Sequence, residues 1–265
     1  MHSLWNGCVW PNSFAAVDFL ETQTPKGVIV QSIVIFGIGK IADVAFHHII
    51  RDARYRIVAF TCDAEWLVSV EGTKVEHYGL PVVPFCDLES VFPPDTVGLH
   101  IAIGYHELNA VRTKKCAEAR ARGYRLISYI SARADVGPWL EHGDNCLILD
   151  GVGVQPGARI GNNVSIWNNT LIGHHSVIED DCWIAAGATL GGVVTLGRSS
   201  FVGLNATVGG EVSIGSESFL GAATLVLKCL DPKSVFISPG TEKFRLDSKT
   251  FLRMTSMPAM AEKTP

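Results

Sequence analysis

"IWNNTLIGHHSVIEDDCWIAAGATLGG", residues 166–192, carries an aliphatic residue at every sixth position. The residue two positions before each aliphatic is small or β-branched, and glycine often follows directly after it. The aliphatic positions in this stretch are Ile166, Ile172, Ile178, Ile184 and Leu190. A period of six fits neither an α-helix nor an alternating strand, so it indicates a repeated structural unit.

The same period extends in both directions, over sixteen positions from Val136 to Val226. Fifteen of the sixteen are Val, Ile or Leu, the exception is His142, and glycine follows directly at ten of them. One hexapeptide can supply a short strand and a corner, and three hexapeptides close a triangular coil. The aliphatic residues then point inward and stack on their equivalents in neighbouring coils, which buries a core that no single repeat could bury alone. The pattern predicts an all-β parallel β-helix of about five coils, with glycine relieving the backbone at each bend.

The sequence before the repeat has a different pattern. "SIVIFGIGKIADVAFHHII" predicts a buried strand, a glycine turn and a helix, while "YRIVAFTCD", "VGLHIAIGY" and "YRLISYI" predict further strands. "HELNAVRTKKCAEARARG" predicts an amphipathic helix. Strands that alternate with helices favour a small parallel α/β domain over residues 31–130. We therefore divide the chain into an unassigned arm (1–30), this domain, the β-helix (131–228) and a C-terminal tail (229–265).

Composition narrows the class of protein. The 265 residues carry a net charge of −4, so the sequence shows no basic footprint for nucleic acid. No apolar run approaches the length of a membrane span, and the N-terminus lacks the features of a signal peptide. The seven cysteines are scattered and never form a C-x-x-C pair, which favours reduced thiols over zinc ligands or disulfides. We expect a cytoplasmic protein without a membrane partner, a nucleic-acid partner or a bound metal.

The segment "GIGKIA" follows a predicted strand and opens a predicted helix. Gly37 and Gly39 would let the backbone approach a phosphate at the helix N-terminus, where free N–H groups favour an anion. Asp63 ends the next predicted strand, near the spacing at which an acid meets a ribose or a base. Tight packing of strand against helix would also explain the glycines. The pattern favours a ligand of the nucleotide type and leaves its identity open, a redox dinucleotide included.

Two adjacent histidines occupy a corner of the repeat. Ile172 and Ser176 take inward positions, so His174 and His175 project from the β-helix. The pair could act in catalysis or could be solvated turn residues. A metal site is disfavoured because the repeat holds only this pair and His142, which takes an inward position in the first coil and is expected to be structural.

Cys182 lies eight residues beyond His174 and could be taken for a nucleophile. The hexapeptide count puts Cys182, like Cys146, in the small inward column. Both thiols are therefore expected to fill the core, which disfavours an acyl-cysteine mechanism.

Over residues 31–243 the chain resembles the NeuD/PglD-type sugar-nucleotide acyltransferases. The most specific part is "GHHSVIEDDCWIAAGATLGGVVTLGRSSFVGLNATVGGEVSIG", and "IFGIGK", "GLPVV", "IAIGY" and "YISARADV" follow in the order seen in that family. The resemblance implies a Rossmann-like N-terminal domain and a left-handed parallel β-helix. It also implies a homotrimer with active sites between subunits, where acetyl-CoA lies in the groove between neighbouring β-helices.

The resemblance also implies residue roles. His174 matches the general base for a sugar amine, and Gly192 matches the glycine whose N–H binds the thioester carbonyl. Contacts with the coenzyme are implied for Gly192, Leu204 and Trp183, the last standing where close relatives have a second histidine. Contacts with the nucleotide are implied for Gly37, Gly39, Lys40, Asp63 and Gly104.

One departure concerns the residue beside the base. The family commonly has Asp or Glu after the catalytic histidine, whereas this chain has His175. Either Glu179, Asp180 or an acid of a neighbouring subunit takes the missing role, or His174 is a weaker base.

The sequence favours N-acetylation of a nucleotide-linked amino sugar in surface-polysaccharide biosynthesis. Direct attack with a His base fits because acyl transfer to an amine needs a base that works near neutral pH and a donor for the oxyanion. O-acetylation of a sugar and a non-catalytic trimeric scaffold or sensor that binds a nucleotide remain the alternatives.

Overall fold

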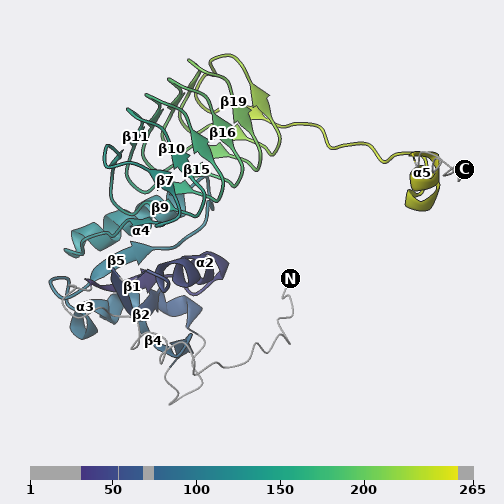
Figure 1. Cartoon of the computed structure of the whole chain (residues 1–265). Coiled ribbons are helices and arrows are strands. Elements are labelled where there is room, and N and C mark those ends of the chain that lie inside the picture. Colours follow the sequence, from purple (N-terminus) through teal and green to yellow (C-terminus); the bar gives the residue numbers. More distant parts are fainter. Residues whose placement is uncertain (1–30, 53, 68–74, 256–265) are drawn as a thin grey trace, which may run out of the picture.

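The computed structural model describes residues 31–52, 54–67 and 75–255. The arm assigned to residues 1–30 lies outside the described residues. Figure 1 shows a small α/β sheet beside a stack of triangular coils, with the C-terminal segment running away from the last coil. None of the helices in the described ranges is long and apolar enough to cross a membrane.

The N-terminal sheet has the strand order β3-β4-β2-β1-β5. All neighbours pair in parallel except β3 and β4, which are antiparallel. The strands and helices predicted from "SIVIFGIGKIADVAFHHII", "YRIVAFTCD", "VGLHIAIGY" and "HELNAVRTKKCAEARARG" are present. The elements are β1 (Gln31–Phe36), α2 (Lys40–Ile49), β2 (Tyr55–Cys62), the 3-10 turn η1 (Ala64–Trp66), β3 (Glu76–His77), β4 (Leu80–Pro84), the 3-10 turn η2 (Phe85–Asp87), α3 (Leu88–Val91), β5 (Gly98–Ile101) and α4 (Ala110–Ala121).

The two longer helices cover opposite faces of the sheet. Ile33 and Ile35 of β1 pack in the same cluster as Phe46 of α2. Val34 of β1, which points to the other face, packs in the same cluster as Cys116 of α4. This alternation follows from the period of two along a strand, and it explains why β1 is apolar at every core position.

The segment "YRLISYI" differs from its prediction as one strand of this sheet. Leu126 makes a single parallel bridge to Leu99 of β5, and β6 (Tyr129–Ile130) already pairs with β9 of the β-helix. The chain therefore passes from the α/β sheet to the coils within this segment.

The repeat forms three parallel sheets, which are the three faces of a triangular β-helix. Strands pair with those eighteen residues further on, as in Leu171 with Thr189, so three hexapeptides make one coil as predicted. The β13 face contains β7 (Asp135–Val136), β10 (Gly153–Val154), β13 (Leu171–Ile172), β16 (Thr189–Leu190), β19 (Thr207–Val208) and β22 (Leu225–Val226). The β14 face contains β8 (Glu141–His142), β11 (Arg159–Ile160), β14 (Val177–Ile178), β17 (Thr195–Leu196) and β20 (Ser213–Ile214). The β15 face contains β6, β9 (Leu147–Ile148), β12 (Ser165–Ile166), β15 (Trp183–Ile184), β18 (Phe201–Val202), β21 (Phe219–Leu220) and β23 (Val235–Phe236).

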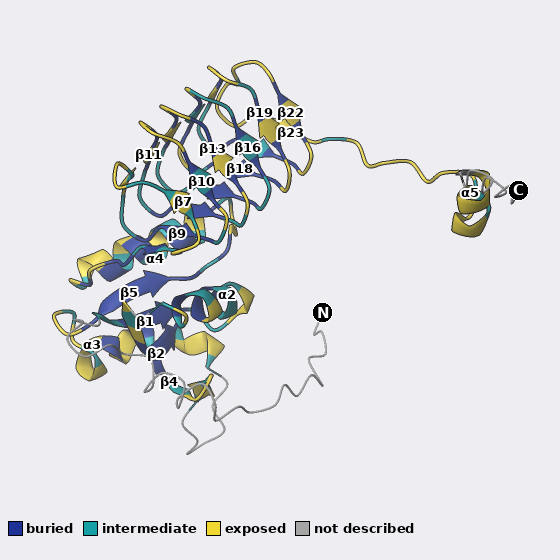
Figure 2. Ribbon diagram, in the orientation of Figure 1, coloured by how far each residue is buried: buried dark blue, intermediate teal, exposed yellow. Residues whose placement is uncertain are grey.

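The arrangement fits a left-handed β-helix, and its pairing runs two strands beyond the hexapeptide count, to β6 and β23. Figure 2 shows the coil interior buried and the corners exposed. The inward side chains form one continuous cluster that includes Ile172, Ile184 and Leu196. Burying each such side chain contributes about 1.5–3 kcal/mol, so the stack of coils is stabilised along its whole length. After β23 only α5 (Ser248–Thr255) follows in the described part of the tail.

Glycine does not have the expected role of making the bend at each corner. The backbone turns at a residue with positive φ that recurs every sixth position, and this residue is often not glycine, for example Asn163, His175 and Asp181. The glycine that follows each aliphatic is needed for another reason. A Cβ on Gly191 would lie 2.6 Å from the backbone nitrogen of Gly210 in the next coil, so glycine permits close stacking there and does not make the bend.

His142 also differs from its expected inward place. It keeps the repeat register by pairing with Ile160, but it is exposed. The physical reason is that β8 is the first strand of its face, so no earlier coil covers it.

Candidate active site

His174 and His175 lie at the corner between β13 and β14, and both are exposed. The backbone N–H of His174 donates to Oε1 of Gln155 in the preceding coil at 2.9 Å. The backbone N–H of His175, which has φ 56°, donates to the carbonyl of Pro156 at 3.2 Å. The pair therefore projects from the β-helix as predicted, on a backbone fixed by hydrogen bonds.

The two imidazoles point in opposite directions along the stack of coils. The Nε2 edge of His174 lies against Gly192 in the next coil, where any Cβ would overlap with it. The ring of His175 lies over Gly157 in the preceding coil, where a Cβ would come within 2.8 Å of Cδ2. Between them the two Nδ1 atoms are 3.2 Å apart. One Nδ1 must donate the hydrogen and the other accept it, so a proton on Nδ1 of His174 leaves its Nε2 unprotonated and facing Gly192.

The backbone N–H of Gly192 has no acceptor among the residues that the structure describes. Some equivalent corner amides are bonded by side chains of adjacent coils, as in His174 to Gln155 and Arg198 to Glu179. At Gly192 the positions that could supply such a side chain are Gly173 and Gly210, which have none. A free amide donor therefore stands beside the Nε2 edge of His174.

The two acids suggested as partners for His174 lie at a different corner, between β14 and β15. Oε2 of Glu179 accepts the backbone N–H of Arg198 at 2.9 Å. Oδ1 of Asp180 accepts the backbone N–H of Asn162 at 2.7 Å. Both carboxylates thus hold neighbouring coils together, and within this chain His175 is the side chain bonded to the ring of His174.

The thiols of Cys146 and Cys182 are fully buried in the coil interior, which confirms that they fill the core. Burial raises the pKa of Cys182 to about 12 and the pKa of Cys146 to about 11. Both therefore stay protonated and are poor nucleophiles. Across the described ranges no three His, Cys, Asp or Glu side chains gather in a way that could hold a metal ion.

Trp183 and Leu204 are not brought together with the histidine pair. Trp183 lies on the β15 face with 3 % of its surface exposed, covered by Tyr105 and Trp167 of the same chain. Leu204 is 55 % exposed at the corner between β18 and β19. Within one chain the residues expected to contact the coenzyme are thus apart: Gly192 and Leu204 lie at two different corners, and Trp183 lies on the β15 face.

Gly37, Gly39 and Gly104 lie together at the carboxyl ends of β1 and β5, but for different reasons. Gly37 has φ 122°, and a Cβ there would lie 2.9 Å from the carbonyl oxygen of Ala102, so local packing requires glycine. Gly39 precedes α2 and has nothing within 4 Å of a Cβ position. Gly104 would make only an ordinary contact with Ile41 at 3.5 Å. Packing therefore explains why residue 37 must be glycine but does not explain the glycines at 39 and 104. Gly39 lies beside open space at the start of α2.

Lys40 begins α2 and is exposed beside Gly39. Asp63 follows β2, and its Oδ1 pairs with Nζ of Lys115 from α4 at 2.8 Å. Lys115 also pairs with Glu118 at 2.8 Å. Although burial opposes its charge, the hydrogen bonds that Lys115 donates to Asp63 and Glu118 raise the pKa of Lys115. The sequence reading missed Lys115, because nothing in a helical "RTKKC" run shows which lysine turns toward the sheet.

Arg112 is a second residue that the sequence reading missed. It extends from α4 into the junction with the β-helix, is 1 % exposed, and donates through Nε to Oδ1 of Asn163 at 2.9 Å. Its guanidinium carbon also lies 5.4 Å from the ring centroid of Trp183. Burial lowers the pKa of Arg112 to about 10, which still leaves it charged at neutral pH. This side chain fixes the α/β sheet against the coils.

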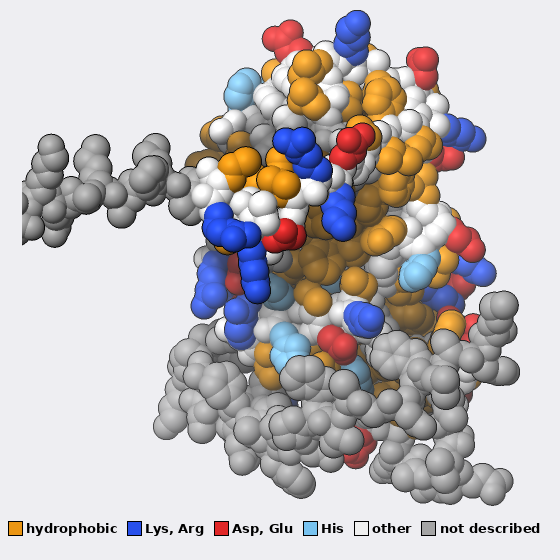
Figure 3. Space-filling view, turned by 90° about the vertical axis from the view of Figure 1, so that its right-hand side faces the viewer, with side chains coloured by type: hydrophobic (Ala, Val, Ile, Leu, Met, Phe, Trp, Pro, Cys, Tyr) orange, Lys and Arg blue, Asp and Glu red, His pale blue; other side chains and the backbone are white. Residues whose placement is uncertain are grey.

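Figure 3 shows hydrophobic side chains gathered in a hollow between the β-helix and the α/β sheet. Trp183, Ala185 and Phe201 form a small cluster at this junction, and Ile41 of α2 and Leu108 pack against it. The carboxyl ends of β1 and β5 therefore open beside an apolar face of the β-helix.

Comparison with known proteins agrees with this fold. Residues 141–174 match the family model described as bacterial transferase hexapeptide (six repeats). The serine acetyltransferase of Bacillus subtilis (strain 168) is 30 % identical over 138 residues, which cover 44 % of this chain and 64 % of that protein. The chain thus matches somewhat less than two thirds of the length of this curated relative.

Two solved structures share most of the described architecture. A variant of perosamine N-acetyltransferase from Caulobacter crescentus, solved with CoA and GDP-perosamine, has a TM-score of 0.69 and 24 % identity, and the match covers 78 % of this chain and 93 % of that chain. The acetyltransferase domain of PglB from Neisseria gonorrhoeae FA1090 has a TM-score of 0.66 and 22 % identity, with 77 % and 94 % coverage. The resemblance to sugar-nucleotide acetyltransferases predicted from the sequence is confirmed at the level of the fold.

Proposed function

We propose that this protein transfers an acetyl group from acetyl-CoA to the amino group of a nucleotide-linked sugar, in the biosynthesis of a surface polysaccharide. The observation that carries the proposal is the corner where Nε2 of His174 lies against Gly192, whose amide is free. The shared fold with acetyltransferases that were solved with CoA supports the coenzyme and the reaction class.

In this mechanism His174 is the general base. With the Nδ1 hydrogen of His174 donated to His175, the lone pair on Nε2 is available to the acceptor amine. The amine nitrogen attacks the thioester carbonyl carbon as Nε2 takes one of its protons. The new C–N bond forms, the C–S bond breaks, and the proton passes from His174 to the leaving sulfur, which departs as the coenzyme thiol.

Gly192 supplies the second element, because its unbonded N–H can donate to the oxygen that becomes negative during the attack. The same corner continues without side chains through Gly191, Gly209 and Gly210, which leaves room for an extended arm along the coils. We assign this strip to the pantetheine arm of acetyl-CoA. The exposed Leu204 is proposed to contact the coenzyme in the groove with a neighbouring subunit, whereas Trp183, which is buried under Tyr105 and Trp167, is not.

For the nucleotide part of the substrate we propose a Rossmann-like site at the carboxyl ends of β1 and β5. The strand order reverses between these strands, and open α/β sheets bind ligands at such a point. The open space in front of Gly39, the exposed Lys40 and the loop at Gly104 suit a diphosphate at the start of α2. Asp63 lies at the end of β2, within reach of a ribose or a base.

We further propose a homotrimer with each site between two subunits. The histidine corner is flanked by Leu171 and Val177, which are 39 % and 38 % exposed on the two adjoining faces. A neighbouring β-helix would cover these apolar side chains and exclude water from the site. Sedimentation equilibrium should give the mass of three chains.

The test replaces the base. His174→Asn, which cannot accept a proton, should lower the rate of free thiol release from acetyl-CoA and an amino-sugar nucleotide by about 100-fold or more. His142→Asn is the matched control, since His142 is exposed in another coil, and it should leave the rate unchanged. Retained CoA binding by the His174 variant would separate lost chemistry from lost folding. Full turnover by His174→Asn would contradict the catalytic role and favour a nucleotide-binding scaffold. A preference of the natural chain for hydroxyl acceptors over amines would favour sugar O-acetylation.

A further inference from the structure

The α/β part of the molecule contains a cleft that meets the proposed nucleotide site at Asp63. One side is formed by Asp63, Ala64 and Glu65, which follow β2. The other side is formed by Glu107, just before α4, and by Ala110, Val111, Lys114 and Lys115 of α4. We name it the Asp63 cleft. Its volume of about 870 Å³ exceeds what a single ribose needs.

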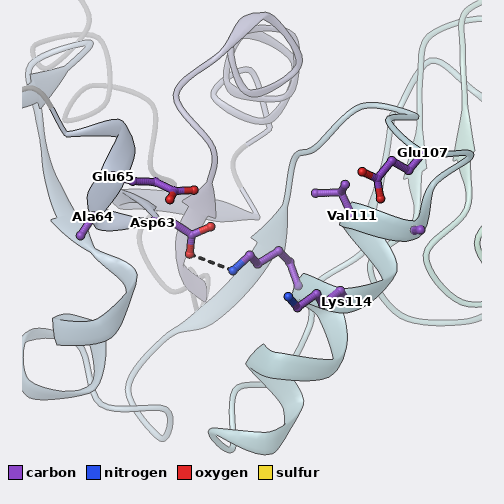
Figure 4. A pocket seen from close by; sticks show the side chains of 8 residues that line it. Asp63, Ala64, Glu65, Glu107, Val111 and Lys114 are labelled. Carbon is purple, nitrogen blue, oxygen red and sulfur yellow. Dashed lines mark hydrogen bonds and ion pairs between the residues drawn. The ribbon is translucent and has the colours of Figure 1, made fainter.

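The walls and floor of the Asp63 cleft differ in chemistry. Figure 4 shows Asp63 and Glu65 on one side of the cleft and Val111 on the other, with Asp63 bonded to the ammonium of Lys115. The apolar side chain of Val111 suits one face of a flat ring, which gains by leaving water there. A polar floor suits the hydrogen-bonding edge of that ring. This combination fits a nucleobase better than a sugar, whose hydroxyl groups point in several directions.

The floor places an acceptor directly beside a donor. The Asp63 carboxylate can accept hydrogen bonds, and the Lys115 ammonium can only donate them. Lys115 is held by both Asp63 and Glu118, so its position is fixed before a ligand enters. Glu65 adds a second carboxylate to the same side of the cleft, which makes that side rich in acceptors.

We propose that the Asp63 cleft binds guanine, so that the substrate of the transferase is a GDP-linked sugar; this rests on the proposed function. The edge of guanine carries two adjacent donors, N1–H and the N2 amino group, followed by the O6 acceptor. The two donors match the Asp63 carboxylate, and O6 matches the ammonium of Lys115. The other bases fit less well. Uracil and thymine have one N–H between two carbonyls, which a carboxylate repels. Adenine and cytosine place one amino group beside a ring-nitrogen acceptor, so they can meet Lys115 but donate to only one oxygen of Asp63, whereas guanine donates to both.

Equilibrium binding to the full-length chain without coenzyme tests the assignment. Calorimetry with GDP, IDP, CDP and UDP should rank GDP first, with UDP at least about tenfold weaker, because only guanine can donate two hydrogen bonds to one carboxylate. IDP lacks only the N2 amino group, so its affinity should fall between those of GDP and UDP. Equal affinities for all four would mean that Asp63 meets the ribose, which every nucleotide shares, and would overturn the guanine assignment.

Substitution of Asp63 should weaken the binding of one nucleotide and strengthen the binding of another. Asp63→Asn replaces one acceptor oxygen with a donor, so GDP binding should weaken by about tenfold while xanthosine diphosphate, with a carbonyl at C2, should bind more tightly than to the natural chain. A gain for one nucleotide cannot come from misfolding. Asp87→Asn, an exposed carboxylate outside the cleft, is the matched control and should change neither affinity. Loss of both nucleotides with unchanged thermal stability would contradict the proposal.

The outcomes for the two proposals are distinguishable. A chain that prefers GDP but releases no thiol with any amino-sugar nucleotide would keep the guanine site and remove the transferase. A chain that acetylates a UDP-linked or dTDP-linked sugar faster than a GDP-linked sugar would keep the transferase and remove the guanine site.

Discussion

His174 and His175 contact each other through the same ring atom, Nδ1, at 3.2 Å, with their ring planes at 79°. Two identical atoms can share a hydrogen bond only if one ring donates and the other accepts. His175 accepts through Nδ1 when its own hydrogen is on Nε2, and its position is fixed because its ring lies over Gly157 and its backbone N–H is bonded to Pro156. It can therefore fix the tautomer of His174 in the way that a carboxylate does for other catalytic histidines.

Two substitutions at His175 test this role. Asn places an acceptor oxygen near the position of Nδ1, whereas Gln places it near Nε2, too far along the side chain to meet His174. We expect kcat of His175→Asn to stay within about threefold of the natural chain and kcat of His175→Gln to fall about tenfold or more, since a mispositioned base loses rate even when it is present. Steady-state thiol release gives kcat and KM separately. Equal loss in both variants would show that the ring of His175 serves packing alone.

Substitution of Gly192, which lies against the Nε2 edge of His174, is a second test of whether the reaction takes place at this corner. A methyl group at this position would overlap with Nε2 of His174, so Gly192→Ala should displace the imidazole and block the approach of the thioester. We expect kcat/KM to fall about 100-fold, in the range seen when one stabilising group is lost from an acyl-transfer site. Gly240→Ala serves as the control because nothing lies within 4 Å of its Cβ position. Unchanged activity in Gly192→Ala would place the chemistry away from this corner.

The β-helix could be predicted closely from the sequence because its geometry is repetitive. Once three hexapeptides make a coil, counting by six tells which side chains point inward, and this count separated buried Cys182 from exposed His174. The same count could not show which way each imidazole turns. Nor could it locate the bend, since Asn163 and His175 adopt a left-handed backbone that glycine was expected to supply.

Contacts between the two halves of the chain escaped the sequence reading for a physical reason. Arg112 and Asn163 are far apart in sequence and meet only because α4 packs against the coils. Lys115 meets Asp63 only because α4 crosses the end of β2. Each depends on tertiary packing, and no local periodicity records it.

Arg112 should therefore be a major stabiliser of the junction. Arg112→Met keeps most of the apolar stem but leaves the carbonyl of Asn163 without its donor, and Oδ1 of Asn163 keeps only the bond from Nδ2 of Asn145. We expect the free energy of unfolding to fall by about 3 kcal/mol, since acceptors left buried and unpaired are costly. Urea unfolding followed by circular dichroism measures the change. Arg125→Met, at an exposed arginine, should cost less than about 0.5 kcal/mol, and a similar loss in both variants would contradict a junction role.

The buried His100 of β5 should make the free energy of unfolding depend on pH. Its side chain is 1 % exposed, its Nδ1 lies 2.8 Å from the carbonyl oxygen of Ile127, and its Nε2 has no partner among the described residues. Burial lowers the pKa of His100 from 6.5 to about 4. Between these values the unfolded chain binds a proton that the folded chain does not, so the stabilisation is complete above pH 6.5 and is lost as the pH falls toward 4. The difference corresponds to about 3 kcal/mol.

The measurement compares unfolding free energies of the natural chain and His100→Asn at pH 7.5 and pH 4.5. Asn can still donate to the carbonyl of Ile127 but does not titrate, so the variant should lose less stability on acidification than the natural chain. Other groups that titrate in this range, such as His48, whose pKa burial also lowers, remain in both proteins and cancel in the comparison. If acid destabilises both proteins equally, His100 does not hold its neutral form in the folded state. A smaller loss in the variant would assign the acid sensitivity of the α/β sheet to this one imidazole.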